Sequence, residues 1–485
     1  MNRFITSLGA LALIASAQAR IVTYPAGEGV PTLGTYTVDV RQDGGAWQPV
    51  AVYPVKVDEV RFTKHHVETA SMAYFDFDGK VDVRVIRNGD KAPENARIRP
   101  LSYNITPRLS GDTLTFTLDT PRNLSVEFDG DIFHNLHLFA NPLDTHRPSA
   151  REIKKAGRKG SRLVYFGPGV HELPDGLLRV KSGQTVYIDG GARVYGMLLA
   201  DSVSDVRFYG RGEVHPKGRG EGIYIQRSRN IDVNGPIVTQ VPVGGSDSVS
   251  ITNVKSISYY GWGDGMNVFA SSNVSYDSVF CRNSDDCHTV YATRKGFNGS
   301  CRNITMKNST LWADVAHPIF IGLHGSAAEL GPDAPADTIT GLHYSNIDIL
   351  DHQERQIDYQ GVFGLVCGDN NIVDGVVFDG VRVENFRLGR LFDIRIAVNK
   401  KYCKAPGGAV RNILFKDIVY NGDRSEVSLI QGYNDERKVE NVTFDNLVIN
   451  GNRIYDDMPD KPKWYKTADM ARIFVGEFVD NIVFK

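Results

Sequence analysis

A short residue pattern recurs along the second half of this 485-residue chain and constrains its fold more than any other feature. Each copy has a polar residue, an aliphatic residue, any residue and a second apolar residue. Copies stand at residues 205–208, 230–233, 273–276, 303–306, 375–378, 412–415, 441–444 and 481–484. With an intervening copy at Val249, the aliphatic positions from Val206 to Ile304 are unevenly spaced. Irregular periods of roughly 20–40 residues are typical of a solenoid whose coils differ in loop length.

The residues within each copy indicate strands. Apolar and polar side chains alternate, and no window keeps the i, i+3, i+4 spacing of a helix over a dozen residues. Most copies begin with asparagine, which tolerates the left-handed backbone of a sharp corner and can bond neighbouring amides. Aliphatic side chains at equivalent places would stack into one core. We therefore predict an all-β protein with a right-handed parallel β-helix of about ten coils over residues 161–485.

The segment ahead of the solenoid shows a different pattern. Residues 36–40, 60–62, 81–85 and 114–118 alternate apolar and polar positions, and glycine-containing turn signals separate them. This pattern predicts a β-sandwich over residues 20–143, joined to the solenoid by a polar, basic connector at residues 144–160. Such a domain could bind carbohydrate through exposed aromatic rings. Because no dense aromatic cluster stands out, a structural cap on the solenoid is favoured.

Residues 1–19 have the form of a signal peptide. A positive start precedes an apolar run from Phe4 to Ala15, and Ala17-Gln18-Ala19 has the small-x-small form of a cleavage site. The run is shorter than the roughly 20 residues of a membrane span, and no other segment is long and apolar enough. We expect export to the periplasm or beyond. The net charge of −2 gives no reason to expect a nucleic acid or an acidic membrane as partner.

Five cysteines are present, so at least one is unpaired in an oxidising compartment. They are Cys281, Cys287, Cys301, Cys367 and Cys403. A disulfide that braces the loop around Asp285 is possible, but buried free thiols are favoured. Neither a Cys-x-x-Cys motif nor a histidine pair offers the spacing of a metal site, so we expect no metal and no cofactor.

Three aspartates lie about one coil apart. Asp264 precedes Asp285 by 21 residues, and Asp286 follows directly. If one coil takes up that span, Asp264 and Asp285 lie on neighbouring strands roughly 4.8 Å apart. Paired carboxylates suit glycosidic cleavage, in which one acid protonates the leaving oxygen and another carboxylate orients water. Since successive strand residues face opposite sides, Asp285 and Asp286 both reach a cleft only if the backbone bulges, for which Ser284 is a candidate.

These residues together resemble the clan of β-helical polysaccharide hydrolases that contains polygalacturonases and dextranases. The resemblance rests on Gly263-Asp264-Gly265 and Ser284-Asp285-Asp286 and covers most of residues 161–485. The sandwich ahead of the helix, and more loosely residues 391–396 and 412–416, resemble glycoside hydrolase family 49, the dextranase and isopullulanase family. That family implies inverting hydrolysis of an α-linked polysaccharide. By motif, Asp285 matches the general acid, and Asp264 and Asp286 match the carboxylates that activate water.

The polygalacturonase pattern matches less well. Its Gly-His-Gly has no counterpart at the usual spacing; the nearest is Gly322-Leu323-His324-Gly325. Its Arg-Ile-Lys triplet appears only as Arg395-Ile396-Ala397, which leaves Arg395 as a substrate-binding candidate. These departures favour a dextran- or pullulan-like α-glucan over a pectin-like uronic-acid polymer.

Further candidates for substrate binding have structural alternatives. Trp262 and Tyr291 could stack on sugar rings or fill the corner of a coil. His288 and His324 could tune the acid or hold a sugar hydroxyl, and a structural histidine is at least as common. A basic group would favour an anionic glycan if it lines the cleft: Arg294, Lys295, Lys400 and Lys401.

Two other functions stay open on the sequence. A β-helical polysaccharide lyase needs a cation or a basic residue to acidify a uronate C5 proton, and three aspartates without an obvious calcium cluster argue against it. A non-catalytic β-helix would bind or display glycans. The sequence leaves open the linkage, endo or exo action, and the oligomeric state.

Overall fold

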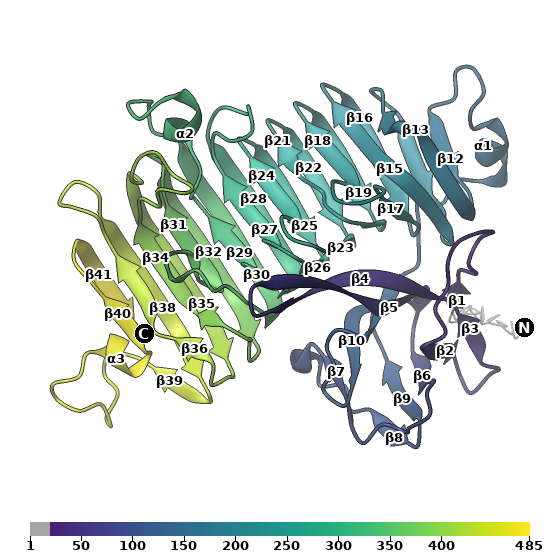
Figure 1. The fold of residues 1–485 in the computed structure, drawn as a ribbon, viewed down its shortest axis with the longest axis horizontal. Helices are drawn as coiled ribbons and strands as arrows, with labels where there is room; N and C mark the ends of the chain where they lie inside the picture. The colour runs from purple at the N-terminus through teal and green to yellow at the C-terminus, as the bar shows by residue number, and fades with distance from the viewer. Residues whose placement is uncertain (1–19) are drawn as a thin grey trace, which may run out of the picture.

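The computed structural model describes residues 20–485 as an N-terminal β-sandwich followed by a long right-handed parallel β-helix (Figure 1). The predicted signal peptide, residues 1–19, lies outside the described residues. The prediction of an all-β chain with this order of parts is confirmed. No helix among residues 20–485 has the length and apolar character that crossing a bilayer requires.

Two sheets form the sandwich around a core of alternating inward side chains such as Val38, Phe75 and Leu138. The first sheet contains β1 (Arg20–Thr23), β4 (Val52–Arg61), β5 (Lys64–Asp78), β7 (Ala96–Arg99), β10 (Arg122–Phe128) and β11 (Leu136–Pro142). The second contains β2 (Tyr36–Arg41), β3 (Gln48–Val50), β6 (Val81–Arg87), β8 (Arg108–Ser110) and β9 (Thr113–Leu118). A helix, α1 (Ala150–Lys155), follows the sandwich.

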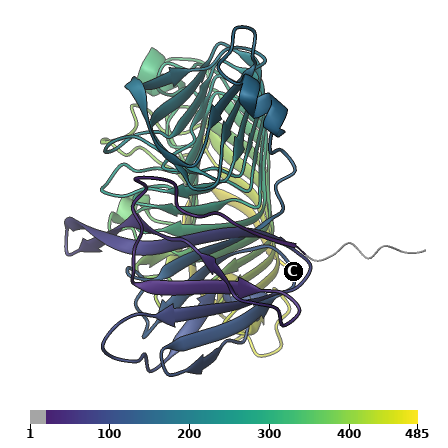
Figure 2. The same ribbon diagram turned by 90° about the vertical axis from the view of Figure 1, so that its right-hand side faces the viewer.

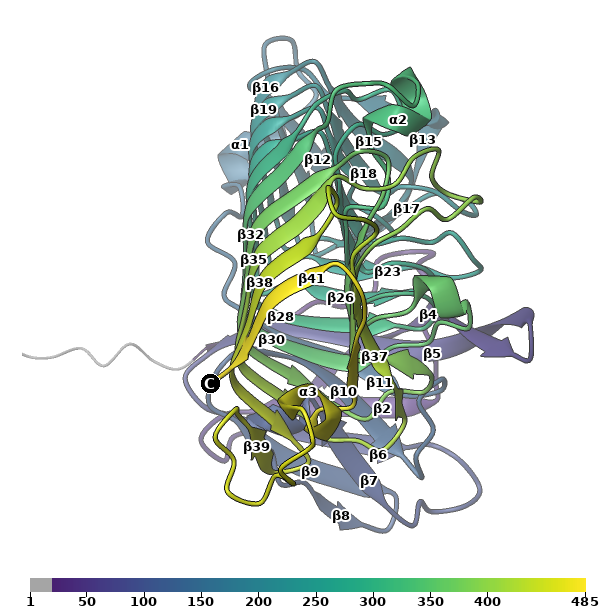
Figure 3. The ribbon, with the colours of Figure 1, turned by 90° about the vertical axis from the view of Figure 1, so that its left-hand side faces the viewer.

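The β-helix has three faces, which the views of Figures 2 and 3 show as stacked coils. The first face contains β12 (Leu163–Phe166), β14 (Thr185–Ile188), β16 (Ser204–Gly210), β19 (Arg229–Asn234), β22 (Asp247–Thr252), β25 (Ser272–Asp277) and β41 (Val479–Phe484). Long strands begin on this face and end on the second: β28 (Cys301–Ala313), β30 (Thr338–Asp351), β32 (Ile372–Val383), β35 (Ala409–Tyr420) and β38 (Val439–Ile449). The second face also contains β17 (Glu213–His215), β20 (Ile237–Val238), β23 (Lys255–Ile257) and β26 (Phe280–Asn283).

The third face contains the shorter strands that follow the second face in each coil. They are the ends of β13 (Gly169–Arg179) and β15 (Ala192–Asp201), then β18 (Ile223–Gln226), β21 (Val243–Gly244), β24 (Met266–Phe269), β27 (His288–Tyr291), β29 (Ile319–Ile321), β31 (Phe363–Cys367), β34 (Phe392–Ile396), β37 (Ser428–Gln431) and β40 (Ile473–Val475). Minor elements are β33 (Gly389–Arg390), β36 (Ser425–Glu426), β39 (Asn452–Ile454), α2 (Ser326–Leu330) and α3 (Thr467–Met470), with short 3-10 turns at Leu101–Tyr103 and Ile357–Tyr359.

The repeated pattern forms one column of the core. Strand pairing aligns the aliphatic positions Val206, Ile231, Val249, Val274, Ile304, Leu342, Val376, Ile413, Val442 and Ile482. The asparagines that precede them adopt positive φ, as at Asn303 (56°) and Asn441 (56°). Their side chains bond along the helix axis: the Asn303 amide donates to Asn273 at 2.6 Å. The predicted left-handed corner is confirmed, and its side chains bond one another from coil to coil.

The sandwich lies along the second face, so it covers a flank of the helix and not its end. Tyr53, Val57 and Phe139 share an apolar cluster with Ile257 and Phe280. Buried ion pairs cross the same contact: Asp76 accepts from Arg211 at 2.9 Å, and Glu384 from Arg99 at 2.6 Å. The hairpin of β4 and β5 extends past the sandwich toward the side where the loops after β17 and β23 project (Figure 3).

All five cysteines are buried free thiols, which confirms the favoured interpretation of the cysteine pattern.

Candidate active site

A cleft of about 790 Å³ lies on the outer surface of the third face. Its floor contains outward side chains of neighbouring strands, among them Phe269 of β24 and Tyr291 of β27. One wall is built by loops that join the second face to the third, and the other by loops that join the third face to the first. Residues as far apart in sequence as His65 and Tyr402 therefore line one cleft.

The three predicted aspartates all line this cleft. Asp264 precedes β24, whereas Asp285 and Asp286 lie in the bend between β26 and β27. Strands β24 and β27 pair with Met266 opposite His288, and the same offset sets Asp264 level with Asp286. The Gly265 N–H accordingly donates to the Asp286 carbonyl at 2.8 Å. The predicted register, which set Asp285 beside Asp264, is off by one position because the coil is slightly longer than the interval between those two aspartates.

The backbone between β26 and β27 is irregular, so strand alternation does not separate Asp285 from Asp286. The Asp286 N–H donates to Asp285 Oδ1 at 3.0 Å, and the Ser284 N–H donates to Ser258 Oγ at 3.2 Å. Gly263 allows the two acidic loops to approach, since a Cβ there would clash with the Ser284 side chain. The sequence predicts a bulge near Ser284, and the structure has a bend between β26 and β27 at this place.

Asp286 is held by a charged hydrogen-bond network. Its Oδ1 accepts from the His317 backbone N–H at 3.2 Å and lies 2.6 Å from His317 Nδ1, and its Oδ2 accepts from the Tyr291 hydroxyl at 3.3 Å. His317 Nε2 faces the Tyr359 carbonyl. Both ring nitrogens therefore face acceptors, which an imidazolium satisfies. Burial lowers the pKa of His317, but the Asp286 charge and its hydrogen bond outweigh it and raise the pKa above its usual value.

The other two acids have different environments. Burial raises the pKa of Asp264 to about 6, with the Asp286 charge adding to it and a 2.5 Å hydrogen bond from Asn267 opposing it. Burial raises the pKa of Asp285 well above its usual range, and the charges of Asp264 and Asp286 raise it further. Burial and two neighbouring carboxylates thus favour the protonated form of Asp285.

Three predicted substrate-binding residues line the cleft. Trp262 is 81% exposed, with the Arg219 guanidinium 5.3 Å from its ring centroid. Tyr291 lies on the floor. Burial lowers the pKa of His324 to about 3, with Arg294 adding to the shift, so this ring is neutral near pH 7.

Two predicted substrate-binding residues, His288 and Arg395, do not line the cleft. His288 is fully buried inside the helix, where Nδ1 lies 2.7 Å from the Met266 carbonyl and Nε2 3.1 Å from the Tyr344 hydroxyl. It alternates with outward Thr289, which places it among core side chains. Arg395 lies on β34, 3.0 Å from Asp393, outside the lining of the cleft.

Sequence reasoning missed several residues of the cleft. His317 follows Asp286 by one coil of 31 residues; its signal was a histidine in the turn ahead of the next third-face strand. Glu354 and Tyr359 come from the loop after β30, and His65 comes from the sandwich. Among residues 20–485, no group of three or more His, Cys, Asp or Glu side chains is arranged to hold a metal ion.

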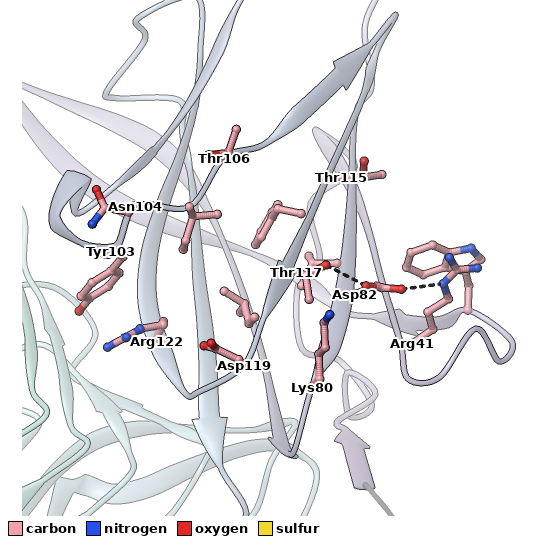
Figure 4. A pocket seen from close by; sticks show the side chains of 15 residues that line it. Arg41, Lys80, Asp82, Tyr103, Asn104, Thr106, Thr115, Thr117, Asp119 and Arg122 are labelled. Carbon is pink, nitrogen blue, oxygen red and sulfur yellow. Dashed lines mark hydrogen bonds and ion pairs between the residues drawn. The ribbon is translucent and has the colours of Figure 1, made fainter.

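A second cavity, of about 800 Å³, lies on the sandwich (Figure 4). The acids that line it are Asp82 and Asp119. Asp82 accepts from Arg41 at 3.3 Å and from Thr117 at 2.9 Å, so its carboxylate is already neutralised and hydrogen-bonded. The cleft on the helix, with three converging acids, is the stronger candidate for chemistry.

Comparison with known proteins agrees with this architecture. No family model matches the sequence. Isopullulanase from Aspergillus niger is 22% identical over 491 residues, which cover 87% of this chain and 78% of that protein. The structure of Dex49A from Penicillium minioluteum has a TM-score of 0.60 at 12% identity and covers 96% of both chains. A family 28 exopolygalacturonase from Yersinia enterocolitica has a TM-score of 0.51 at 10% identity, over 84% of this chain and 96% of that one. This chain is thus similar, over most of its length, to β-helical glycoside hydrolases, and its resemblance to glycoside hydrolase family 49 is confirmed.

Proposed function

We propose that this protein is an exported glycoside hydrolase that cleaves an α-linked polysaccharide with inversion. The observation that carries the proposal is the convergence of Asp264, Asp285 and Asp286 in one cleft, where burial raises the pKa of Asp264 to about 6 and the pKa of Asp285 well above its usual range. Pairs of titratable groups whose surroundings push their pKa values apart divide into acid and base. The isopullulanase relative and the dextranase resemblance favour a pullulan- or dextran-like α-glucan.

In this mechanism, Asp285 donates its proton to the glycosidic oxygen as the bond from that oxygen to the anomeric carbon breaks. A water on the opposite face of the sugar attacks the anomeric carbon, and the one proton that it loses goes to the pair formed by Asp264 and Asp286, of which one carboxylate accepts it and the other helps to orient the water. His317 and Tyr291 fix the orientation of Asp286 through their bonds to both of its oxygens. One carboxyl group starts protonated and the base starts ionised, so a single displacement completes the reaction.

The pH profile of kcat/KM is expected to be bell-shaped. Asp264 has a raised pKa of about 6 and is active as a base only when ionised, so the rate rises as pH increases through about 6. Burial raises the pKa of Asp285 well above its usual range, and this group is active only when protonated, so the rate falls as pH increases through the pKa of Asp285. Initial rates between about pH 4 and 9 test this. A rate that decreases continuously as the pH increases from 4 would contradict the assignment of Asp264 as a base.

Product analysis tests the function itself. The purified protein is incubated with α-glucans, polygalacturonans and arabinans, and the products are separated by chromatography. Hydrolysis gives new reducing ends without ultraviolet absorbance, elimination gives an unsaturated product, and a glycan-binding protein gives neither. Reducing ends from an α-glucan would support the proposal, whereas an unsaturated product would show a lyase.

A pectin-like substrate is the second candidate, and the cations of the cleft favour it. Arg219, Arg294, Lys295 and Lys401 line the cleft. Within residues 20–485, none of these four has a carboxylate within ion-pair distance, whereas many basic residues elsewhere are paired, as Arg282 is with Asp314. Unpaired cations attract anionic groups. Faster cleavage of polygalacturonan than of dextran, reduced by added salt, would identify an anionic substrate.

A further inference from the structure

The tip of the β4–β5 hairpin contacts the loop that leads into Asp264. Asp58 of β4 is fully buried, and its Oδ2 lies 2.5 Å from His65 Nδ1 of β5 and accepts from the Gly261 N–H at 3.1 Å. The ring of His65 lies 6.0 Å from that of Tyr260, and His65 itself lines the cleft. A carboxylate of the sandwich therefore binds the loop that begins the catalytic segment of the helix.

This loop has a conformation that its side chains do not favour. Tyr260, Gly261 and Trp262 have φ of 67°, 54° and 49°. A left-handed backbone is uncommon for bulky residues and persists where surrounding contacts determine it. The contacts that hold this loop come from outside it, since Asp58 fixes the Gly261 amide and Arg219 lies 4.5 Å from the Tyr260 ring.

The same loop presents an aromatic surface to the cleft. Trp262 is 81% exposed and Tyr260 is 47% exposed, and the Arg219 guanidinium contacts both rings. Exposed aromatic faces at the edge of a cleft are suited to stacking on the apolar face of a pyranose ring. Asp264 closely follows Trp262 in the sequence. The position of these aromatic rings therefore depends on the same loop that positions Asp264 at the proposed site of cleavage.

We propose that the Asp58–His65 pair is a positioning element, by which the N-terminal sandwich fixes the 260–262 loop and with it a sugar-binding subsite made of Trp262 and Tyr260. The proposal rests on the proposed function of the cleft and adds a role for the sandwich. His65 orients Asp58 through one ring nitrogen, and Asp58 in turn orders the loop through the Gly261 amide. The ligand of this subsite is a pyranose unit of the polysaccharide, one or more units away from the scissile bond.

Steady-state kinetics with a set of variants test the proposal. His65→Ala removes the partner of Asp58 and is expected to raise KM for the polymer about tenfold with kcat changed less than about threefold, the size of one lost aromatic contact. His65→Asn keeps a donor near the same place and should restore most of the affinity. His66→Ala is the matched control, because His66 is the next residue of β5 and its side chain points to the opposite side of the strand.

A double-mutant cycle separates positioning from a general effect on stability. If His65 acts through Trp262, the variant His65→Ala/Trp262→Ala binds no more weakly than Trp262→Ala alone. Hydrogen exchange of a peptide covering residues 258–264 should be faster in His65→Ala and unchanged in His66→Ala. An unchanged KM in His65→Ala, or independent effects of the two substitutions, would overturn the proposal. A wild-type protein that cleaves no glycan would instead overturn the proposed function, and the exchange measurement would still report on the loop.

Discussion

Asp285→Asn is expected to abolish turnover without unfolding the protein. General acid catalysis contributes about 10²–10⁴-fold, and the amide keeps the shape of the carboxyl group but has no proton to give. The Asp286 N–H that now bonds Asp285 Oδ1 can bond the amide oxygen in the same way. The loss should therefore appear in kcat, with a thermal transition close to that of the wild type.

A substrate with a leaving group that needs no protonation isolates the acid role. On such a substrate Asp285→Asn should recover part of the wild-type rate, because the carboxylates that we propose to activate water are intact. Asp277→Asn is the matched control, since Asp277 lies on the first face and bonds Asn308 and Lys307 away from the cleft. Near-normal rates of Asp285→Asn on the natural polymer would contradict the assignment.

Removal of both carboxylates that we propose to activate water is expected to have an effect as large as the loss of Asp285. Asp264 and Asp286 lie level on adjacent coils, so they are placed to share one water. Each single asparagine variant should retain some activity, and Asp264→Asn/Asp286→Asn should fall by about 10²–10⁴-fold. Values of kcat/KM for the three variants measure this.

Azide distinguishes the base role from the acid role, because it attacks the anomeric carbon without a base. It should restore turnover of the double variant on a substrate with a good leaving group and form a glycosyl azide of inverted configuration. Azide rescue of Asp285→Asn together with no rescue of the double variant would reverse the assigned roles.

The solenoid was predictable because its physical cause is local. Each coil needs an aliphatic side chain at the equivalent core position and, just before it, a residue that accepts positive φ. Both requirements are visible in the sequence of every copy. The copy at residues 375–378 has Gly375 in place of asparagine, yet Val376 joins the same column. Glycine meets the same backbone requirement, which is why the pattern is variable there.

The candidate site was only partly predictable. Asp264, Asp285 and Asp286 are close in sequence and one coil apart, so their convergence follows from the fold. His288 was predicted to face the substrate because it lies near the aspartates in sequence, but nearness in sequence does not decide which side of a strand a residue faces. Its strand pairs Val290 with the core residue Val268, and His288 lies on the same side of the strand as Val290.

The remaining residues of the cleft could not be predicted, because the loops between strands differ in length and one residue comes from the other domain. His317 reaches Asp286 across a coil of 31 residues, longer than the coil that separates Met266 from His288, and spacing alone does not align coils of unequal length. His65 comes from the other domain, far earlier in the sequence, and no periodicity of the helix relates it to Gly261. Tertiary packing of the hairpin decides that contact.

The anomeric configuration of the first product tests the central claim most directly. An inverting enzyme holds its acid and base about 6.5–9.5 Å apart to leave room for water, and a retaining one about 5–5.5 Å apart. An NMR time course on an α-linked polymer that the protein cleaves follows the anomeric protons before mutarotation. We predict that the β-anomer appears first. Initial release of the α-anomer would contradict the account, because a carboxylate nucleophile and not a water would then lie opposite Asp285.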